Sequence, residues 1–340
     1  MRLRVLRSAW GLRLVNADGR FLEPARVLDG VCASGLDGLE ASLADLGARR
    51  DGERGDAWMR AAAERSLSLV VSAYSSWPNY SDDCYDSAKP AHAHEADLLL
   101  QLRVIAELHA RAPVSPLLGV NCHTGTDVWS EAEGARFFAA IAGPVATLQL
   151  PRLTHETHRG RFLCCPFATA RLLDAVPSVR LTSDLSHWVI KTERLLDARE
   201  EAELLRTHIA PACDHIHARV GTAQAPQLVD DDAPSAAVAS ERLHGWWQTI
   251  WDAREAASFS ARDTIFTATV EHGPFELDAR GQSVGYWPAL PSGKPVPGPP
   301  LDVKIERAAR RLRNVFDRWH SHPYRGKSSC QSPASSQPAV

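Results

Sequence analysis

The chain has 340 residues, of which 44% are hydrophobic and 23% are charged, and its formal net charge is -3. This composition is typical of a globular protein with a large buried core, and it excludes a chain that is disordered throughout. The small negative net charge gives no electrostatic reason to expect a nucleic-acid partner. No apolar run approaches the roughly 20 residues that span a bilayer, so we predict no membrane-spanning segment.

The cysteine pattern indicates a reducing compartment. The chain has seven cysteines, which include adjacent Cys164 and Cys165 and form no C-x-x-C pair, so neither a disulfide framework nor a zinc ribbon is indicated. Residues 1–20 are rich in arginine, as in a transit peptide, but lack the apolar segment of a secretory signal. We interpret them as the first strand and expect a soluble, cytoplasmic protein.

Short apolar runs alternate with longer amphipathic stretches along the chain, which is typical of βα units around a parallel sheet. Eight runs predict strands, at residues 5–12, 38–43, 67–75, 116–124, 146–156, 179–188, 215–221 and 264–273. Residues 94–112 and 131–143 repeat apolar side chains every three or four positions and predict outer helices. The sequence therefore predicts the α/β class and a (β/α)8 TIM barrel.

The C-terminal region predicts a late closing helix. A Pro/Gly-rich stretch at 285–300 predicts a loop, and the amphipathic pattern at 301–322 predicts a long helix after it. The Ser/Pro-rich residues 326–340 predict a disordered tail. We therefore expect one barrel domain over residues 1–325.

In such barrels the active site lies at the C-terminal ends of the strands. The predicted strands four to eight end in residues of metal-ligand type, in the segments NCHTGTD, THETHRGR, SDLSHW, HIHARVG and VEHG. A single acid or histidine at a strand end is usually a cap or a solvated loop residue. However, Glu156, Asp184, His217 and Glu271 come from four adjacent strands, so we expect them to converge. Three carboxylates and one imidazole favour Mn, Mg or Co, and zinc stays open.

This order of residues resembles the xylose-isomerase-like barrels, which include ketose 3-epimerases, hydroxypyruvate isomerase, inosose dehydratase and endonuclease IV. The resemblance spans residues 5–275. In its epimerase branch a Glu, an Asp, a His and a Glu that end strands five to eight bind one divalent metal ion. The resemblance implies that role for Glu156, Asp184, His217 and Glu271.

The resemblance also implies substrate contacts. His187 matches the histidine that follows the metal-binding aspartate in that branch, and Arg219 loosely matches an arginine after the metal-binding histidine. An arginine that follows the strand-five glutamate is matched by both Arg159 and Arg161, and the spacing does not choose between them.

Other histidines surround the predicted ligands. We expect His123 to line the barrel mouth as a secondary polar contact. His155 and His158 flank Glu156 and are expected to point elsewhere. His215 lies two positions before the strand-seven ligand and shares its face, which makes it a further substrate contact or ligand.

Some residues carry weaker signals. Three residues end or follow strands, namely Trp10, Glu40 and Trp188. The aromatic ones could form walls beside a sugar ring, but simple packing is the commoner role. The segment after strand seven predicts either a solvated connection or a lid. In the lid interpretation three of its residues face the substrate: Gln224, Gln227 and Asp230.

The implied reaction is an isomerisation or epimerisation of a sugar, or of a related polyol or hydroxy-ketone. A divalent ion would chelate neighbouring carbonyl and hydroxyl oxygens and stabilise the enediolate. Glu156 and Glu271 lie on strands five and eight, so they can act as a base and acid pair on opposite sides of the substrate. The alternative that both glutamates only bind the metal stays open. Assembly into a homo-oligomer also stays open.

Three alternatives remain. An endonuclease-IV-like phosphodiesterase would use three metals, but His215-Ile-His217 replaces the Asp-x-His of that branch, and the net charge offers little for DNA binding. A dehydratase would need the same ion and base, so the sequence cannot separate it from an isomerase. A non-catalytic barrel is disfavoured because all four predicted ligands are present.

Overall fold

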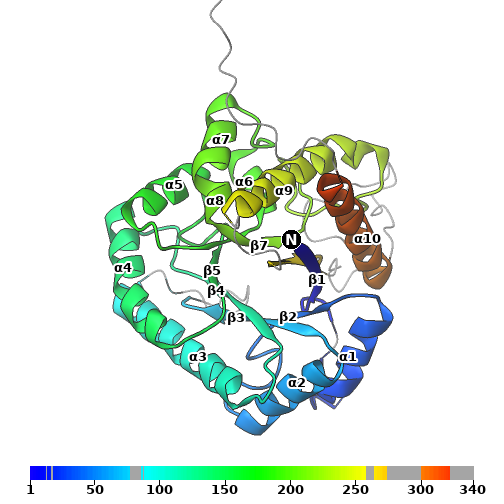
Figure 1. Ribbon diagram of the computed structural model, residues 1–340. Coiled ribbons are helices and arrows are strands. Elements are labelled where there is room, and N and C mark those ends of the chain that lie inside the picture. The colour runs from blue at the N-terminus through cyan, green and yellow to red at the C-terminus, as the bar shows by residue number, and fades with distance from the viewer. Residues whose placement is uncertain are drawn as a thin grey trace, which may run out of the picture.

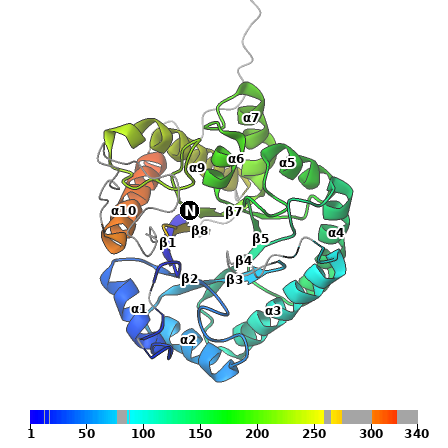
Figure 2. The ribbon, with the colours of Figure 1, turned by 180° about the vertical axis from the view of Figure 1, so that it is seen from behind.

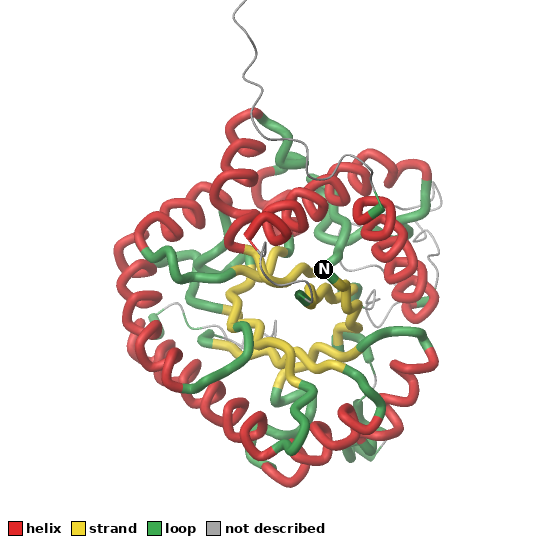
Figure 3. The backbone as a smooth tube through the Cα atoms, viewed as in Figure 1, coloured by secondary structure: helices red, strands yellow, loops and turns green. Residues whose placement is uncertain are grey.

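The computed structural model describes residues 1–12, 14–16, 18–76, 86, 88–257, 264–273 and 300–321. Its strands form a closed barrel in chain order, from β1 to β8. All neighbours pair in parallel, and β1 pairs with β8 to close the ring (Figure 3). Helices surround the ring on the outside (Figures 1 and 2). The prediction of a (β/α)8 barrel is confirmed.

The eight strands all overlap the predicted runs. They are β1 (Arg2–Ser8), β2 (Gly38–Ser42), β3 (Ser68–Tyr74), β4 (Leu117–His123), β5 (Leu153–Glu156), β6 (Leu181–Ser183), β7 (Cys213–His217) and β8 (Ile265–Val270).

The helices of the outer ring vary in length. They are α1 (Pro24–Ala33), α2 (Gly52–Glu64), α3 (Ala91–Arg111), α4 (Glu131–Thr147), α5 (Pro166–Ala175), α6 (Leu185–Thr192), α7 (Arg199–Leu204), the π-helical turn η2 (Leu205–Ile209), α8 (Ala210–Ala212), the 3-10 turn η3 (Pro234–Ala236), α9 (Ala237–Ala257) and α10 (Leu301–His320). In the described part of the chain, none of them is both long and apolar enough to cross a membrane.

Two of the predicted strands include residues that are helical in the structure. The run at 146–156 begins in α4, which continues to Thr147, and Gln149 then takes a left-handed conformation with φ 52° that ends the helical region. The run at 179–188 stops after Ser183 because the side chain of Asp184 accepts from the Ser186 N–H and caps α6. Each of these apolar runs thus includes part of a helix and part of a strand.

The two faces of the barrel wall carry different kinds of side chain. Apolar residues such as Leu39, Ile216 and Ala268 belong to the core between the strands and the helices. The neighbouring positions Glu40, His215 and Thr269 contact one another across the barrel interior. The interior is therefore strongly polar at this level, and burying so many polar groups requires that they be hydrogen-bonded.

The closing helix α10 forms as predicted and packs against β1, β8 and α9. The Trp251 ring lies 5.1 Å from that of Phe316 and 5.3 Å from that of Trp319, between ring centroids. Trp319 also donates from Nε1 to Asp252 at 2.9 Å. Residues 285–299 of the predicted loop and the predicted tail at 326–340 lie outside the described residues.

The segment after β7 contacts α10 through its acidic run. Asp231 lies 3.3 Å from Arg311 Nη1 and 3.7 Å from Lys304 Nζ. Gln227 binds the backbone of Gly273 twice, donating to its carbonyl and accepting from its N–H, both at 3.0 Å. Gln227 therefore ties this segment to the residues that follow β8.

The aromatic contact between α9 and α10 should dominate the stability of the closing helix. We expect Trp251→Ala to lower the free energy of unfolding by about 3–5 kcal/mol, because a fully buried indole leaves a cavity between the two helices. Urea denaturation measures this change. Val238→Ala on the same helix is the control, since Val238 is 69% exposed and its loss should change the value by less than about 0.5 kcal/mol. Equal effects of the two substitutions would contradict this account.

Candidate metal centre at the barrel mouth

The four predicted ligands meet at the C-terminal ends of neighbouring strands. Glu156 ends β5, Asp184 caps α6 directly after β6, His217 ends β7, and Glu271 follows β8. One ligand atom from each of the four lies within 4.8 Å of the others. All four residues are buried. The structure thus holds a candidate metal-binding cluster here, and the ligand role of each residue stays a prediction.

Two buried atoms of this cluster fit a cation. His217 Nδ1 lies 2.6 Å from Glu271 Oε2 and 3.7 Å from Glu156 Oε2. Neither His217 Nδ1 nor Glu271 Oε2 makes a well-aligned hydrogen bond to any described residue. Since buried polar atoms are nearly always paired, a coordinated divalent ion would satisfy both. The donor set of three carboxylates and one imidazole therefore suits such an ion.

Arg219 supplies positive charge to the same cluster. Its Nη2 lies 2.5 Å from Asp184 Oδ2, and its Nη1 lies 3.1 Å from Glu271 Oε1. Its Nε donates to Ser186 Oγ at 2.9 Å, and the side chain is almost fully buried. The guanidinium therefore binds two of the carboxylates that a cation would need.

The charges of the carboxylates reflect this environment. Burial raises the pKa of Asp184 to about 6, although Arg219 opposes the change. Burial also acts to raise the pKa of Glu271, but Arg219 and His217 outweigh it, so that this pKa lies below its ordinary value. The pKa of Glu156 is likewise held low, because His123 and His217 together outweigh its burial. Glu156 and Glu271 are therefore ionised at neutral pH, as metal ligands must be.

A second group of ligand-type residues adjoins the first at Glu156. His123 Nε2 lies 3.0 Å from Glu156 Oε2, and His158 completes a buried group of three. The His158 ring lies 3.7 Å from the His187 ring, between centroids. The expectation that His158 points elsewhere is therefore wrong, because residues 156 and 158 are two positions apart, and side chains at this spacing lie on the same face of an extended segment.

His155 points away from this site. Its Nδ1 lies 2.7 Å from Thr124 Oγ1, and its ring packs edge-on against Phe138 of α4 at 4.9 Å. Burial lowers the pKa of His155 to about 3, so it is neutral. Strand alternation correctly separated His155 from Glu156, the predicted ligand that follows it.

The predicted substrate contacts gather beside the cluster. His187 Nε2 lies 2.6 Å from Arg219 Nη2, and His187 Nδ1 lies 2.7 Å from Arg159 Nη1. Burial lowers the pKa of His187 well below its ordinary value, so the ring is neutral. Arg161 donates to Ser76 Oγ at 2.5 Å. Contact with a substrate stays a prediction for all of these side chains.

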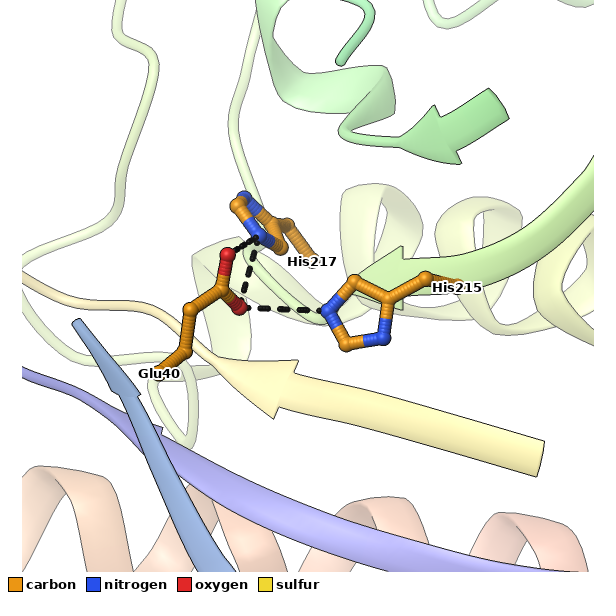
Figure 4. Close-up of side chains that lie close together, drawn as sticks. All are labelled: Glu40, His215 and His217. Carbon is orange, nitrogen blue, oxygen red and sulfur yellow. Dashed lines mark hydrogen bonds and ion pairs between the residues drawn. The ribbon is translucent and has the colours of Figure 1, made fainter. Parts of the chain in front are cut away.

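Sequence reasoning gave too little weight to Glu40, which lies on β2 inside the barrel. Figure 4 shows its carboxylate between the rings of His215 and His217. The distance to His217 Nε2 is 3.0 Å from each oxygen, and that from Oε2 to His215 Nε2 is 3.2 Å. The available signal was an acid within the apolar run GLEASL at 38–43. His215 does share a face with His217, as expected.

Trp10 and Trp188 differ in position. Trp188 is fully buried and donates from Nε1 to the Leu163 carbonyl at 2.9 Å, so it packs in the core. Trp10 is 41% exposed, and its ring lies 5.9 Å from the guanidinium of Arg219. Trp10 therefore presents an exposed aromatic surface beside the buried cluster.

Comparison with known proteins identifies the fold. No protein-family model matches the sequence, and no curated protein matches it. Among solved structures, a xylose isomerase-like TIM barrel protein from Mycobacterium smegmatis in complex with magnesium is 12% identical, with a TM-score of 0.58 over 94% of this chain and 97% of that chain.

Two further solved structures have a similar fold. A xylose isomerase domain protein from Alicyclobacillus acidocaldarius is 15% identical, with a TM-score of 0.55 over 94% of this chain and 99% of that one. The probable 3-DHS dehydratase AsbF from Bacillus anthracis is 14% identical, with a TM-score of 0.54 over 92% and 99%. The predicted resemblance is thus confirmed at the level of fold, because this chain shares the barrel fold of these proteins.

Arg219 should compete with a divalent ion for the carboxylates. We expect Arg219→Gln to lower the free energy of unfolding of the metal-free protein by about 3–5 kcal/mol, because buried carboxylates lose their fixed cation. Added Mn²⁺ should raise the melting temperature of this variant by more than that of the wild type. Thermal unfolding with and without Mn²⁺ measures both effects.

Arg206→Gln is the control, because Arg206 pairs with Glu203 on the exposed surface. It should change the free energy of unfolding by less than about 1 kcal/mol, with an unaltered response to Mn²⁺. Identical Mn²⁺-induced shifts in wild type and Arg219→Gln would show that Arg219 and the ion do not share these ligands.

Proposed function

We propose that this protein is a divalent-metal-dependent isomerase or epimerase that acts on a sugar, or on a related polyol or hydroxy-ketone. The observation that carries the proposal is the convergence of Glu156, Asp184, His217 and Glu271 at the active-site end of the barrel. Mn, Mg or Co is the preferred ion because three of the four donors are carboxylates, and zinc remains an outcome of the metal analysis.

The proposed ligands would be the three carboxylates and His217 through its Nδ1. A bound divalent ion would polarise the carbonyl and hydroxyl oxygens of the substrate and stabilise negative charge that develops on them. The carboxylate of Asp184 is held by the Ser186 N–H at 3.0 Å and the Ser186 hydroxyl at 2.6 Å. We assign Asp184 to binding alone, because these contacts fix its orientation.

Glu156 and Glu271 are the proposed acid and base pair. Glu156 ends β5 and Glu271 follows β8, and these strands are not neighbours in the ring, so the two side chains approach the site from different sides. Their lowered pKa values keep them ionised, and an ionised carboxylate can accept the proton from a carbon next to a carbonyl. Epimerisation requires that one group remove a proton on one face and the other return it on the opposite face.

The remaining side chains would bind and orient the substrate. Arg219 and His187 lie within hydrogen-bond distance of each other at the edge of the cluster, and Arg159 adjoins His187. Trp10 offers an apolar surface on which the C–H face of a sugar can pack. His123, in contact with Glu156, is proposed as a further polar contact.

The structural relatives fit this proposal at the level of fold. The mycobacterial barrel was solved with magnesium, which is one of the ions that the donor set favours. AsbF is described as a probable dehydratase, so the same fold accommodates loss of water. A dehydratase on this site would use the same ion and base, and would expel a hydroxyl group in place of reprotonation.

One observation favours a second candidate, a metal-dependent phosphodiesterase. His123, Glu156 and His158 form a second buried group that shares Glu156 with the first. Two ions that share a carboxylate are typical of enzymes that hydrolyse phosphate esters. Metal stoichiometry separates the candidates, because the isomerase proposal needs one ion.

The first test is metal content by elemental analysis of the purified protein. We expect close to one Mn, Mg, Co or Zn ion per chain in the wild type, and loss of that ion in both Asp184→Asn and Glu271→Gln. Glu201→Gln is the control, since Glu201 on α7 is a buried carboxylate that pairs with Arg194. The metal content of this variant should match that of the wild type. A wild type that takes up no divalent ion, even when ions are added, would contradict the proposal.

The second test identifies the reaction. Metal-loaded protein is incubated in D₂O with ketoses, inososes and hydroxypyruvate, and deuterium at the carbon next to the carbonyl is followed by NMR. Isomerisation or epimerisation predicts deuterium incorporation with a new isomer, and both should fall by at least about 100-fold in Glu156→Gln and Glu271→Gln. Loss of water without isomer formation would indicate a dehydratase, and cleavage of a model phosphodiester with two ions bound would favour the second candidate.

A further inference from the structure

Glu40 is a buried carboxylate that the proposed reaction does not use. It lies on β2 inside the barrel and is 4% exposed. Burying an ionised carboxylate is costly unless polar groups compensate for the lost water. Neighbouring polar groups must therefore stabilise the carboxylate of Glu40.

Protein donors surround both oxygens of Glu40. Thr269 Oγ1 donates to Oε2 at 2.5 Å, and Asn121 Nδ2 donates to Oε1 at 3.0 Å. The rings of His215 and His217 face the same carboxylate, as Figure 4 shows. Glu40, His215 and His217 also satisfy the distance criterion for a metal-binding group. However, amide, hydroxyl and imidazole groups already contact both oxygens of Glu40. This favours a hydrogen-bonding role over a metal-ligand role for its carboxylate.

The two nitrogens of His217 face opposite partners. Nε2 lies 3.0 Å from Glu40, whereas Nδ1 lies 2.6 Å from Glu271. Burial acts to lower the pKa of His217, but Glu40, Glu156 and Glu271 outweigh it and hold this pKa well above its ordinary value, so that without an ion both nitrogens carry protons. An imidazole that binds a metal keeps one N–H and one lone pair, and the hydrogen bond made by one nitrogen decides which nitrogen carries the lone pair. If Nε2–H donates to Glu40, the lone pair stands on Nδ1, toward the other proposed ligands. A histidine that binds a metal requires this arrangement, and it commonly has a carboxylate behind it.

We propose that Glu40 is a positioning residue that holds His217 in its Nε2-protonated form and so presents Nδ1 to a divalent ion. This inference rests on the proposed metal site and deepens it. It extends to Glu156, because Asn121 Nδ2 donates both to Glu40 and to Glu156 Oε2, the latter at 2.8 Å. One buried carboxylate on β2 thereby orients two proposed ligands on β5 and β7.

His215 takes a supporting role in this arrangement. Its Nε2 faces Glu40, and its Nδ1 lies 2.8 Å from Thr267 Oγ1. Both ring nitrogens thus have partners within the barrel interior. We assign His215 to fixing Glu40, in place of the substrate contact expected from the sequence.

The test measures the dissociation constant of Mn²⁺ by titration calorimetry. Glu40→Ala should weaken Mn²⁺ binding by about 10- to 100-fold, and Glu40→Gln should weaken it less, because its amide oxygen can still accept from Nε2. Glu201→Gln should bind Mn²⁺ as the wild type does. If Glu40→Ala does not fold, the isosteric Glu40→Gln carries the comparison.

A second measurement reports on the ring itself. Nitrogen-15 NMR of histidine-labelled protein with Mg²⁺ distinguishes the two protonation forms of His217, whose signal is assigned by its loss in His217→Gln. We expect a proton on Nε2 in the wild type, and a mixture of forms or a shifted signal in Glu40→Ala. A merely structural role of Glu40 would not select one form.

The outcomes separate this inference from the proposed function. Unchanged Mn²⁺ affinity in both Glu40 variants, or a wild-type His217 that carries its proton on Nδ1, would overturn the inference, while loss of metal in Asp184→Asn would keep the proposed function. A wild type that binds no divalent ion would overturn both.

Discussion

The structure depends on how the barrel accommodates buried negative charge. Glu40, Glu156, Asp184 and Glu271 are all at most 9% exposed and lie at or below one end of the barrel. Like charges that are buried away from bulk water repel strongly and have lost their hydration. Arg219 binds two of these carboxylates, while histidines and hydroxyl groups bind the others. A divalent ion would complete this neutralisation, which is why the cluster favours one.

Much of this arrangement could be predicted from the sequence. In a parallel barrel every strand delivers its last residues to the same end, so the positions of Glu156, Asp184, His217 and Glu271 followed from strand order alone. Element boundaries were less predictable. The apolar run before Glu156 is shared between α4 and β5, and periodicity alone cannot show where a left-handed residue such as Gln149 ends the helix.

Glu40 was difficult to recognise for a different reason. Its importance lies in partners from β4, β7 and β8, none of which is near it in sequence. A local pattern shows only an acid in an apolar run, which usually marks a strand end. The position of His158 was predicted wrongly because alternation separates only His155 from Glu156, whereas His158, two positions after Glu156, shares its face. Both residues act through tertiary contacts that only the closed barrel creates.

The fold itself does not decide the chemistry, because barrels of this kind support many reactions. The ionised Glu156 and Glu271, and the position of His217 between Glu40 and Glu271, support the proposal of a single ion between four ligands. The most direct measurement is anomalous X-ray diffraction from crystals grown with Mn²⁺. The account predicts one strong anomalous peak within coordinating distance of Glu156, Asp184, His217 Nδ1 and Glu271. No peak there, with Arg219 still bridging Asp184 and Glu271 at saturating Mn²⁺, would contradict it.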